Sequence, residues 1–126
     1  MSYTIDVQGK IRTVVCRGSL VSQDLPEIAE KLNAARGRDP QTMAILADLS
    51  GLSEIEIDIS SMENFAAGLL RLTLPENIKI AVVAKHLIQY SYAESFKILL
   101  DHPQIEVQVF ESERDAHAWL SEQEEQ

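Results

Sequence analysis

Apolar and polar positions along the chain follow two periods, one typical of strands and one typical of helices. Residues 3–7 (YTIDV) place Tyr3, Ile5 and Val7 on one face, which is the period of a half-buried strand. Residues 11–17 (IRTVVCR) are rich in β-branched side chains and predict a second strand. Because only residues 8–10 separate the two, we expect an antiparallel hairpin.

Three later stretches also predict strands. Residues 42–49 (TMAILADL) and 78–84 (IKIAVVA) are apolar almost throughout, which indicates central strands covered on both faces. Residues 105–110 (IEVQVF) alternate instead. We therefore expect this last strand to lie nearer an edge of the sheet.

The first two helical patterns are each marked by a capping-box spacing. Residues 22–37 carry an apolar face, and Asp24 and Glu27 lie three positions apart near its start. Ser60 and Glu63 repeat that spacing before the second helix. The broad apolar face of this second helix consists of Met62, Phe65, Ala66, Leu69 and Leu70.

The third helical pattern covers residues 86–100 and stops at the sequence DHP. Its inward face is expected to hold Tyr92, Ala93, Phe96, Leu99 and Leu100. Tyr90 points elsewhere, so it is a candidate for lining a pocket or a partner surface. A fourth helix is expected from Ser112, burying Ala116, Trp119 and Leu120.

The resulting order is β-β-α-β-α-β-α-β-α. Strands that alternate with helices predict right-handed crossovers and parallel pairing, and the opening hairpin makes the sheet mixed. We therefore expect an α/β fold. The 126 residues fit one domain, residues 1–126, and can bury about two-thirds of the surface of the unfolded chain.

Charge and composition exclude several classes of function. The net charge of −9 disfavours nucleic acid, which needs a basic surface. There is no apolar run of 18 residues and no secretory signal at the N-terminus, so we expect a cytoplasmic protein that does not span a membrane. The single cysteine, Cys16, cannot form an internal disulfide.

Candidate catalytic and metal-binding residues form no recognisable motif. His86, His102 and His117 lack the spacing of metal ligands. Cys16 shares a strand face with Val14 and is expected to be a small buried hydrophobe. Because no acid, base and nucleophile converge, we expect no metal, no cofactor and no enzyme activity.

Residues 48–65 (DLSGLSEIEIDISSMENF) join the third predicted strand to the second helix. We interpret their first part as a linker, in which Ile55, Ile57 and Ile59 alternate with acidic residues and predict a short extra strand or a lid. Ser60 and Ser61 lie where a helix N-terminus would favour a phosphate. The alternative is that Ser60 is simply the N-cap.

The element order, the strand ending in ADLSGL and the final VQVFESERDAHAWL resemble the STAS superfamily of sulfate-transporter and anti-sigma-factor-antagonist domains. Within it, the chain looks most like the sporulation-protein-AA-like branch. The resemblance implies a mixed sheet of about five strands with helices packed mainly on one side.

Signalling members of the superfamily carry D-L-S-x-V-x-x-I-D-S-S-G, and a partner kinase phosphorylates the serine after the second aspartate. Here Asp58 comes late, and Ile59 takes the place of the acceptor. Only an alignment shifted onto Ser60 or Ser61 preserves the switch.

The resemblance also permits an apolar ligand site, because members of this branch have been proposed to bind nonpolar ligands. The candidate ligand-binding residues are Ile57, Ile59, Phe65, Leu69 and Tyr90. The alternative is that they belong to the core or anchor a loop.

We therefore expect first a non-enzymatic protein that binds a small apolar, lipid-like ligand or a protein partner. The second expectation is a phospho-regulated anti-sigma factor antagonist acting through Ser60 or Ser61, and an enzyme is third. A homodimer is also expected, because Leu87 and Tyr90 lie off the inward face of their helix.

Overall fold

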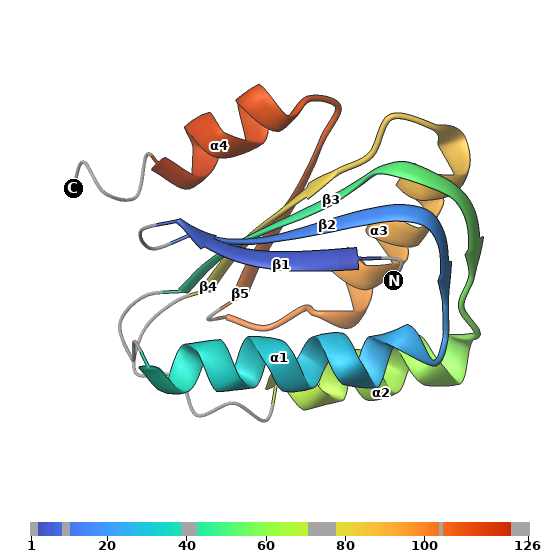
Figure 1. The fold of residues 1–126 in the computed structure, drawn as a ribbon, viewed down its shortest axis with the longest axis horizontal. Coiled ribbons are helices and arrows are strands. Elements are labelled where there is room, and N and C mark those ends of the chain that lie inside the picture. The colour runs from blue at the N-terminus through green and yellow to red at the C-terminus, as the bar shows by residue number, and fades with distance from the viewer. Residues whose placement is uncertain (1–2, 9–10, 39–42, 71–77, 104, 122–126) are drawn as a thin grey trace.

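The computed structural model describes residues 3–8, 11–38, 43–70, 78–103 and 105–121 (Figure 1). Its strands are β1 (Tyr3–Gln8), β2 (Ile11–Val21), β3 (Met43–Glu56), β4 (Ile78–Val83) and β5 (Ile105–Phe110). Its helices are α1 (Asp24–Arg38), α2 (Ile59–Leu70), α3 (Leu87–Leu99) and α4 (Glu113–Ser121). The predicted element order is confirmed.

The five strands form one mixed sheet in the order β1-β2-β3-β4-β5. β1 pairs with β2 antiparallel, as the predicted hairpin requires, and the remaining pairs are parallel. β3 and β4 are central and β5 lies at an edge, so the interpretation of the apolar and alternating stretches is also confirmed.

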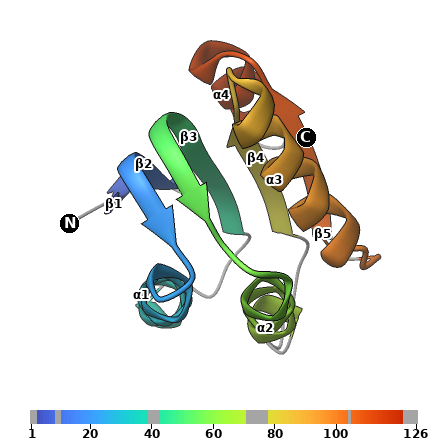
Figure 2. The ribbon, with the colours of Figure 1, turned by 90° about the vertical axis from the view of Figure 1, so that its right-hand side faces the viewer.

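The helices cover the two faces of the sheet unequally. α1, α2 and α3 contribute to one large core, and Figures 1 and 2 show α1 and α2 side by side beneath the sheet. α4 packs alone on the opposite face, in a small cluster made of Ala44, Leu46, Ala81, Val83, Ala116 and Leu120. Helices on mainly one side are therefore confirmed. No helix in the described ranges is long and apolar enough to cross a membrane.

The stretch interpreted as a linker after Asp48 is a strand. β3 continues to Glu56, and β2 continues past its predicted end to Val21, so that the two pair in parallel as far as Val21 and Glu56. The lid interpretation of this strip is therefore wrong, while the strand interpretation holds as far as Glu56, except that the strand is the continuation of β3 and not a separate one. Ile55 belongs to β3 itself, and Ile57 follows directly as a buried residue.

Two β-bulges explain why the sequence pattern did not predict this part of β3. The register with β2 shifts between Val15 and Arg17 and again between Gly18 and Ser19, and at each shift β3 carries one additional residue. Its buried side chains are consequently spaced by three positions instead of two, at Leu49, Leu52 and Ile55. Residues 49–55 therefore lack the alternation by which strands are recognised.

Glycine is favoured on both strands at these bulges. Gly18 has a φ of 73°, in the left-handed region that side chains with a Cβ rarely adopt. A Cβ on Gly51 would lie 3.0 Å from the carbonyl oxygen of Cys16, so a larger residue would push β2 and β3 apart.

The extended part of β3 has an edge that β4 does not cover, because β4 ends at Val83, opposite Asp48. The fully buried side chain of Gln89, on α3, occupies this edge. Its amide nitrogen donates to the carbonyl oxygens of Leu52 at 2.9 Å and Ser50 at 3.3 Å. Its amide oxygen accepts from the backbone N–H groups of Lys85 and His86, which precede α3. Gln89 thus provides hydrogen-bond partners for backbone groups at the uncovered edge of β3 and at the start of α3.

α2 is capped by Asp58, so the prediction that Ser60 is the N-cap is wrong. The Asp58 carboxylate accepts from the backbone N–H of Ser61 at 2.7 Å, while Ser60 lies exposed inside the first turn. The Ser22 hydroxyl donates to the same carboxylate at 3.2 Å and accepts from the Asp58 backbone N–H at 3.0 Å. This pair joins the starts of α1 and α2.

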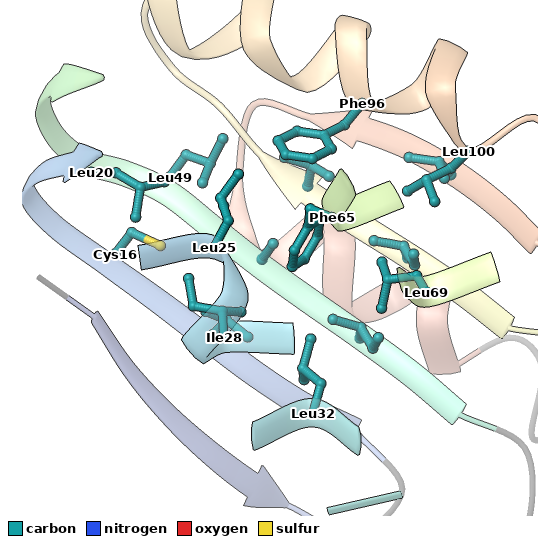
Figure 3. Close-up of a pocket in the computed structure, with 16 residues that line it drawn as sticks. Cys16, Leu20, Leu25, Ile28, Leu32, Leu49, Phe65, Leu69, Phe96 and Leu100 are labelled. Carbon is teal, nitrogen blue, oxygen red and sulfur yellow. The ribbon is translucent and has the colours of Figure 1, made fainter. Parts of the chain in front are cut away.

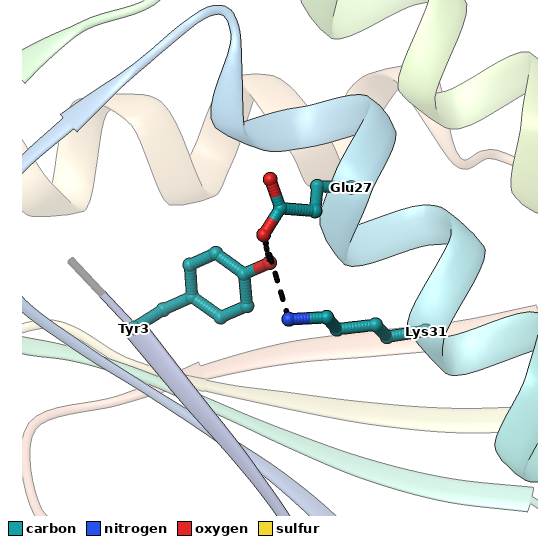
Figure 4. Close-up of polar contacts among 3 residues, drawn as sticks. All are labelled: Tyr3, Glu27 and Lys31. Carbon is teal, nitrogen blue, oxygen red and sulfur yellow. Dashed lines mark hydrogen bonds and ion pairs between the residues drawn. The ribbon is translucent and has the colours of Figure 1, made fainter. Parts of the chain in front are cut away.

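The predicted capping box at Asp24 and Glu27 is also not formed. α1 begins at Asp24 itself, whose carboxylate accepts from the Val21 backbone N–H. The Glu27 side chain turns instead to β1, where it accepts a 2.6 Å hydrogen bond from the Tyr3 hydroxyl (Figure 4). The Lys31 Nζ atom lies 3.4 Å from the same Glu27 carboxylate. These contacts hold β1 against α1. At α4, by contrast, Ser112, where this helix was expected to start, accepts from the Asp115 N–H.

Replacing Asp58 is expected to destabilise the protein more than replacing Ser60. Hydrogen bonds from the Ser61 N–H, and then from the Ser61 and Ser22 hydroxyls, hold the pKa of Asp58 below its ordinary value of 3.8. Its contribution to stability is therefore present at neutral pH and lost as pH falls through the range below that value. The urea midpoint of Asp58→Ala should lie below that of Ser60→Ala at pH 7, with the gap shrinking by pH 3. Ser60→Ala should stay within about 0.5 kcal/mol of wild type; equal midpoints at pH 7 would show that Asp58 is not the cap.

Gln89→Leu is expected to lower the free energy of unfolding by about 3 kcal/mol, because it removes the partner of the buried Leu52 carbonyl and of the partly buried backbone groups of Ser50, Lys85 and His86. The matched control is Gln108→Leu, the same change at an exposed position on β5, which should cost less than about 0.5 kcal/mol. Chemical denaturation measures both. Similar stability of the two variants would mean that the hydrogen bonds of Gln89 do not stabilise the fold.

Candidate functional site

A cavity of about 90 Å³ lies in the main core between the sheet and the three helices on that face (Figure 3). All the residues that line it are apolar: Val14, Cys16, Leu20, Leu25, Ile28, Leu32, Ile45, Ala47, Leu49, Phe65, Leu69, Ile80, Val82, Phe96, Leu100 and Val107. The arrangement suits an apolar guest, and the Cys16 thiol is the one ionisable group in this lining.

Small side chains at the centre of the sheet explain why room is left. Val14, Ala47 and Val82 lie in register across β2, β3 and β4 and form part of the cavity floor. Ala47 is the smallest residue of the lining and lies on the central strand. Helices pack on a sheet at a distance set by their larger side chains, so small residues below them leave space.

Phe65 forms the wall where α2 meets both neighbouring helices. Its ring packs edge-on against Phe96 of α3, with centroids 5.5 Å apart and an interplanar angle of 76°. Figure 3 shows these rings and Leu25 of α1 converging at the cavity. Phe65 is only half-buried, because its other side borders the surface between α1 and α2.

That surface is hollowed into a groove of about 150 Å³, which we call the α1–α2 groove. It is lined by Leu25, Pro26, Ala29, Ser61, Asn64 and Phe65. Two of these residues, Leu25 and Phe65, also line the cavity, so they form the partition between the two spaces. Unlike the cavity, the groove offers hydrogen-bonding groups, from Ser61 and Asn64.

The end of the α1–α2 groove at which both helices start is negatively charged. Asp58, with its lowered pKa, is ionised at neutral pH and is bonded to Ser61 of the groove lining and to Ser22 before α1. The first turn of α1 also carries Asp24. Glu27, in the same turn, does not add to this charge, because its side chain turns to Tyr3 on β1 and lies 3.4 Å from Lys31.

Cys16 lines the cavity but is unsuited to nucleophilic chemistry. Burial, with smaller effects from Asp48 and Asp24, raises the pKa of its thiol to about 12. The thiol is therefore protonated at neutral pH. This agrees with the expectation that Cys16 is a small buried hydrophobe.

The structure brings together only part of the predicted ligand set. Phe65 and Leu69 both line the cavity. Ile57 is buried in the same core but is not part of the lining, whereas Ile59 is 73% exposed. Tyr90 is 46% exposed on α3, away from the cavity.

Ser60 and Ser61, the candidate phosphate acceptors, differ in their surroundings. Ser60 is exposed, while Ser61 is partly buried and lines the α1–α2 groove. The N–H of Ser61 is already bonded to the Asp58 carboxylate. A phosphate on Ser61 would therefore meet a negative charge where the free N–H groups of a helix start would otherwise attract it.

Sequence reasoning missed the strand residues and the α1 residues of the cavity wall. The apolar face of α1 was identified, but nothing in the sequence connects it with Phe65. The one available signal was Ala47, a small residue in the middle of a buried strand of larger apolar side chains. Gln89 was also missed, although it lies four positions before the buried Ala93 on the inward face of α3.

Solved structures similar to this chain share its fold. An uncharacterised protein with a SpoIIAA-like fold from Shewanella loihica matches with a TM-score of 0.61 and 19% identity, over 94% of this chain and 91% of that one. An anti-sigma factor antagonist from Mycobacterium paratuberculosis matches with a TM-score of 0.58 and 12% identity, over 94% and 92%. The anti-sigma factor antagonist SpoIIAA in its unphosphorylated form matches with a TM-score of 0.56 and 15% identity, over 94% and 96%.

A comparison with protein-family models shows the family of this chain, whereas the solved structures show only its fold. No curated protein sequence matches the chain. The family model described as SpoIIAA-like, however, matches residues 11–121, which include every element except β1. The resemblance identified in the sequence is thereby confirmed, and the chain belongs to the SpoIIAA-like family.

Proposed function

We propose that this protein is a non-enzymatic binding domain whose cavity takes a small apolar ligand or the apolar part of a larger one. The observation that carries the proposal is a wholly apolar cavity in the middle of the core, walled by α1, α2, α3 and the sheet. Cavities lined only by apolar side chains accept apolar guests.

The volume of the cavity indicates how much stability it costs and how large a guest it can hold. At about 24 cal/mol per Å³, 90 Å³ of empty space costs about 2 kcal/mol of stability. A guest that fills the space recovers part of this and stabilises the fold by mass action. Since a cavity of about 150 Å³ accommodates benzene, this one suits an apolar group of roughly four carbon atoms without movement of its walls.

Binding to a protein partner is the second function that we propose, in addition to a ligand. It is supported by the fold shared with anti-sigma factor antagonists and by the apolar residues that α3 exposes: Leu87, Ile88, Tyr90 and Ile98. Large exposed apolar residues are common at contacts between proteins. The expected homodimer would use the same helix and stays a prediction.

Phosphorylation on Ser60 or Ser61 remains the alternative mechanism, with less support than ligand binding. Asp58 already supplies the negative charge at the start of α2, and its carboxylate accepts from the Ser61 N–H. A phosphoserine carries close to two further negative charges. Repulsion between these groups offsets the attraction of the helix dipole.

Filling the cavity from within tests the proposal directly. Ala47→Val places two additional methyl groups at the cavity floor, so we expect an unchanged or higher free energy of unfolding, by up to about 1 kcal/mol. The same change should weaken the binding of 1-hexanol, followed by NMR titration, at least fivefold, because the end of its chain (about four carbon atoms) and the new methyl groups compete for one space.

Ala44→Val is the matched control, because Ala44 lies on the same strand but faces α4, in the small cluster on the other side of the sheet. It should destabilise the protein by about 1–3 kcal/mol through overpacking and leave binding of 1-hexanol unchanged. If Ala47→Val destabilises as much as Ala44→Val and leaves binding intact, the cavity is not the ligand site.

A further inference from the structure

We propose that the ligand is amphipathic: its apolar tail enters the cavity, and its head, which carries no negative charge, lies in the α1–α2 groove. This inference rests on the proposed function and adds the chemical class of the ligand. It follows from the position of the groove, the polar groups that line it and the charge at its end.

The position of the groove makes it the outer half of a two-part site. Leu25 and Phe65 line both spaces, so a molecule passing between these two side chains would reach from one into the other. Phe65 is half-buried and is held on its other side by the Phe96 ring. These two side chains stand between the spaces, so the proposed ligand would displace them to reach from the groove into the cavity.

The lining of the groove combines apolar side chains with two polar ones, Ser61 and Asn64, which are more exposed than Leu25 of the partition. Leu25 is buried, whereas Asn64 is exposed and Ser61 is intermediate. An amide both donates and accepts hydrogen bonds, and a hydroxyl does the same. The groove can therefore hold a polar head at the surface while the cavity excludes one.

The charge at the end of the groove selects against anions. The starts of α1 and α2 meet here through Ser22 and Asp58, and two helix starts would ordinarily attract a negative head. Asp58 already occupies the Ser61 N–H and stays ionised at neutral pH because its pKa is lowered. A carboxylate or phosphate head would meet this charge, whereas a hydroxyl or an ammonium head can bond to it.

Three ligands that share a six-carbon chain and differ in their head group test the inference. 1-Hexanol, hexylamine and hexanoate are titrated into the full chain at pH 7.5, where the second is cationic and the third anionic. We expect the alcohol and the amine to bind, and hexanoate to bind about tenfold more weakly than the alcohol, as expected for one charge repulsion at short range. Equal or tighter binding of hexanoate would overturn the proposed head group.

Variants separate this inference from the proposed function. Asp58→Ser keeps a capping hydroxyl but removes the charge, so the difference between 1-hexanol and hexanoate should shrink to less than threefold. Glu63→Gln is the control: it removes the same charge, but Glu63 follows Ser61 by two positions and so lies about 200° around α2, away from the groove.

Ala47→Val completes the set, because it should weaken all three ligands alike. If all three bind, are weakened by Ala47→Val and are indifferent to Asp58→Ser, the cavity is a ligand site and the head-group inference is wrong. If none of them binds the wild-type protein, both the inference and the proposed cavity function fail.

Discussion

β2 and β3 extend beyond the end of β4, and the backbone groups of this extension need hydrogen-bond partners from other parts of the molecule. β2 and β3 satisfy each other on one side as far as Val21 and Glu56. On the other side of β3, the Gln89 amide donates to the carbonyl oxygens of Ser50 and Leu52. The position of α3 is thus determined by a hydrogen-bonding requirement of the sheet as well as by its apolar face.

The same extension determines where α1 and α2 begin, and through them the site. Both helices start at the far end of the paired strands, joined by Ser22 and Asp58, and run back beneath the sheet. Their larger apolar side chains then lie under a row of small ones that includes Ala47. The cavity therefore results from the geometry of the fold combined with one small residue, and the groove results from the parallel course of the two helices.

Much of this fold could be predicted from the sequence, because periodicity reports burial. The element order, the mixed sheet, the edge position of β5 and the start of the last helix near Ser112 all follow from local patterns. The continuation of β3 through residues 49–56 could not be recognised, because two bulges change the spacing of its buried residues to three. The cap of α2 was misplaced because Asp58 and Ser60 are both good caps and tertiary contacts with Ser22 favour the first.

The site was harder to predict than the fold. Periodicity placed Phe65 and Leu69 on a buried face, but it cannot show that the opposite walls leave space between them. The most direct test of the central claim is a crystal structure determined under xenon pressure, since xenon enters apolar cavities that are real and accessible. We predict xenon in contact with Ala47, Phe65 and Leu69, and none there in Ala47→Val crystals. A wild-type structure with no xenon at that position, or with side chains filling it, would contradict the account.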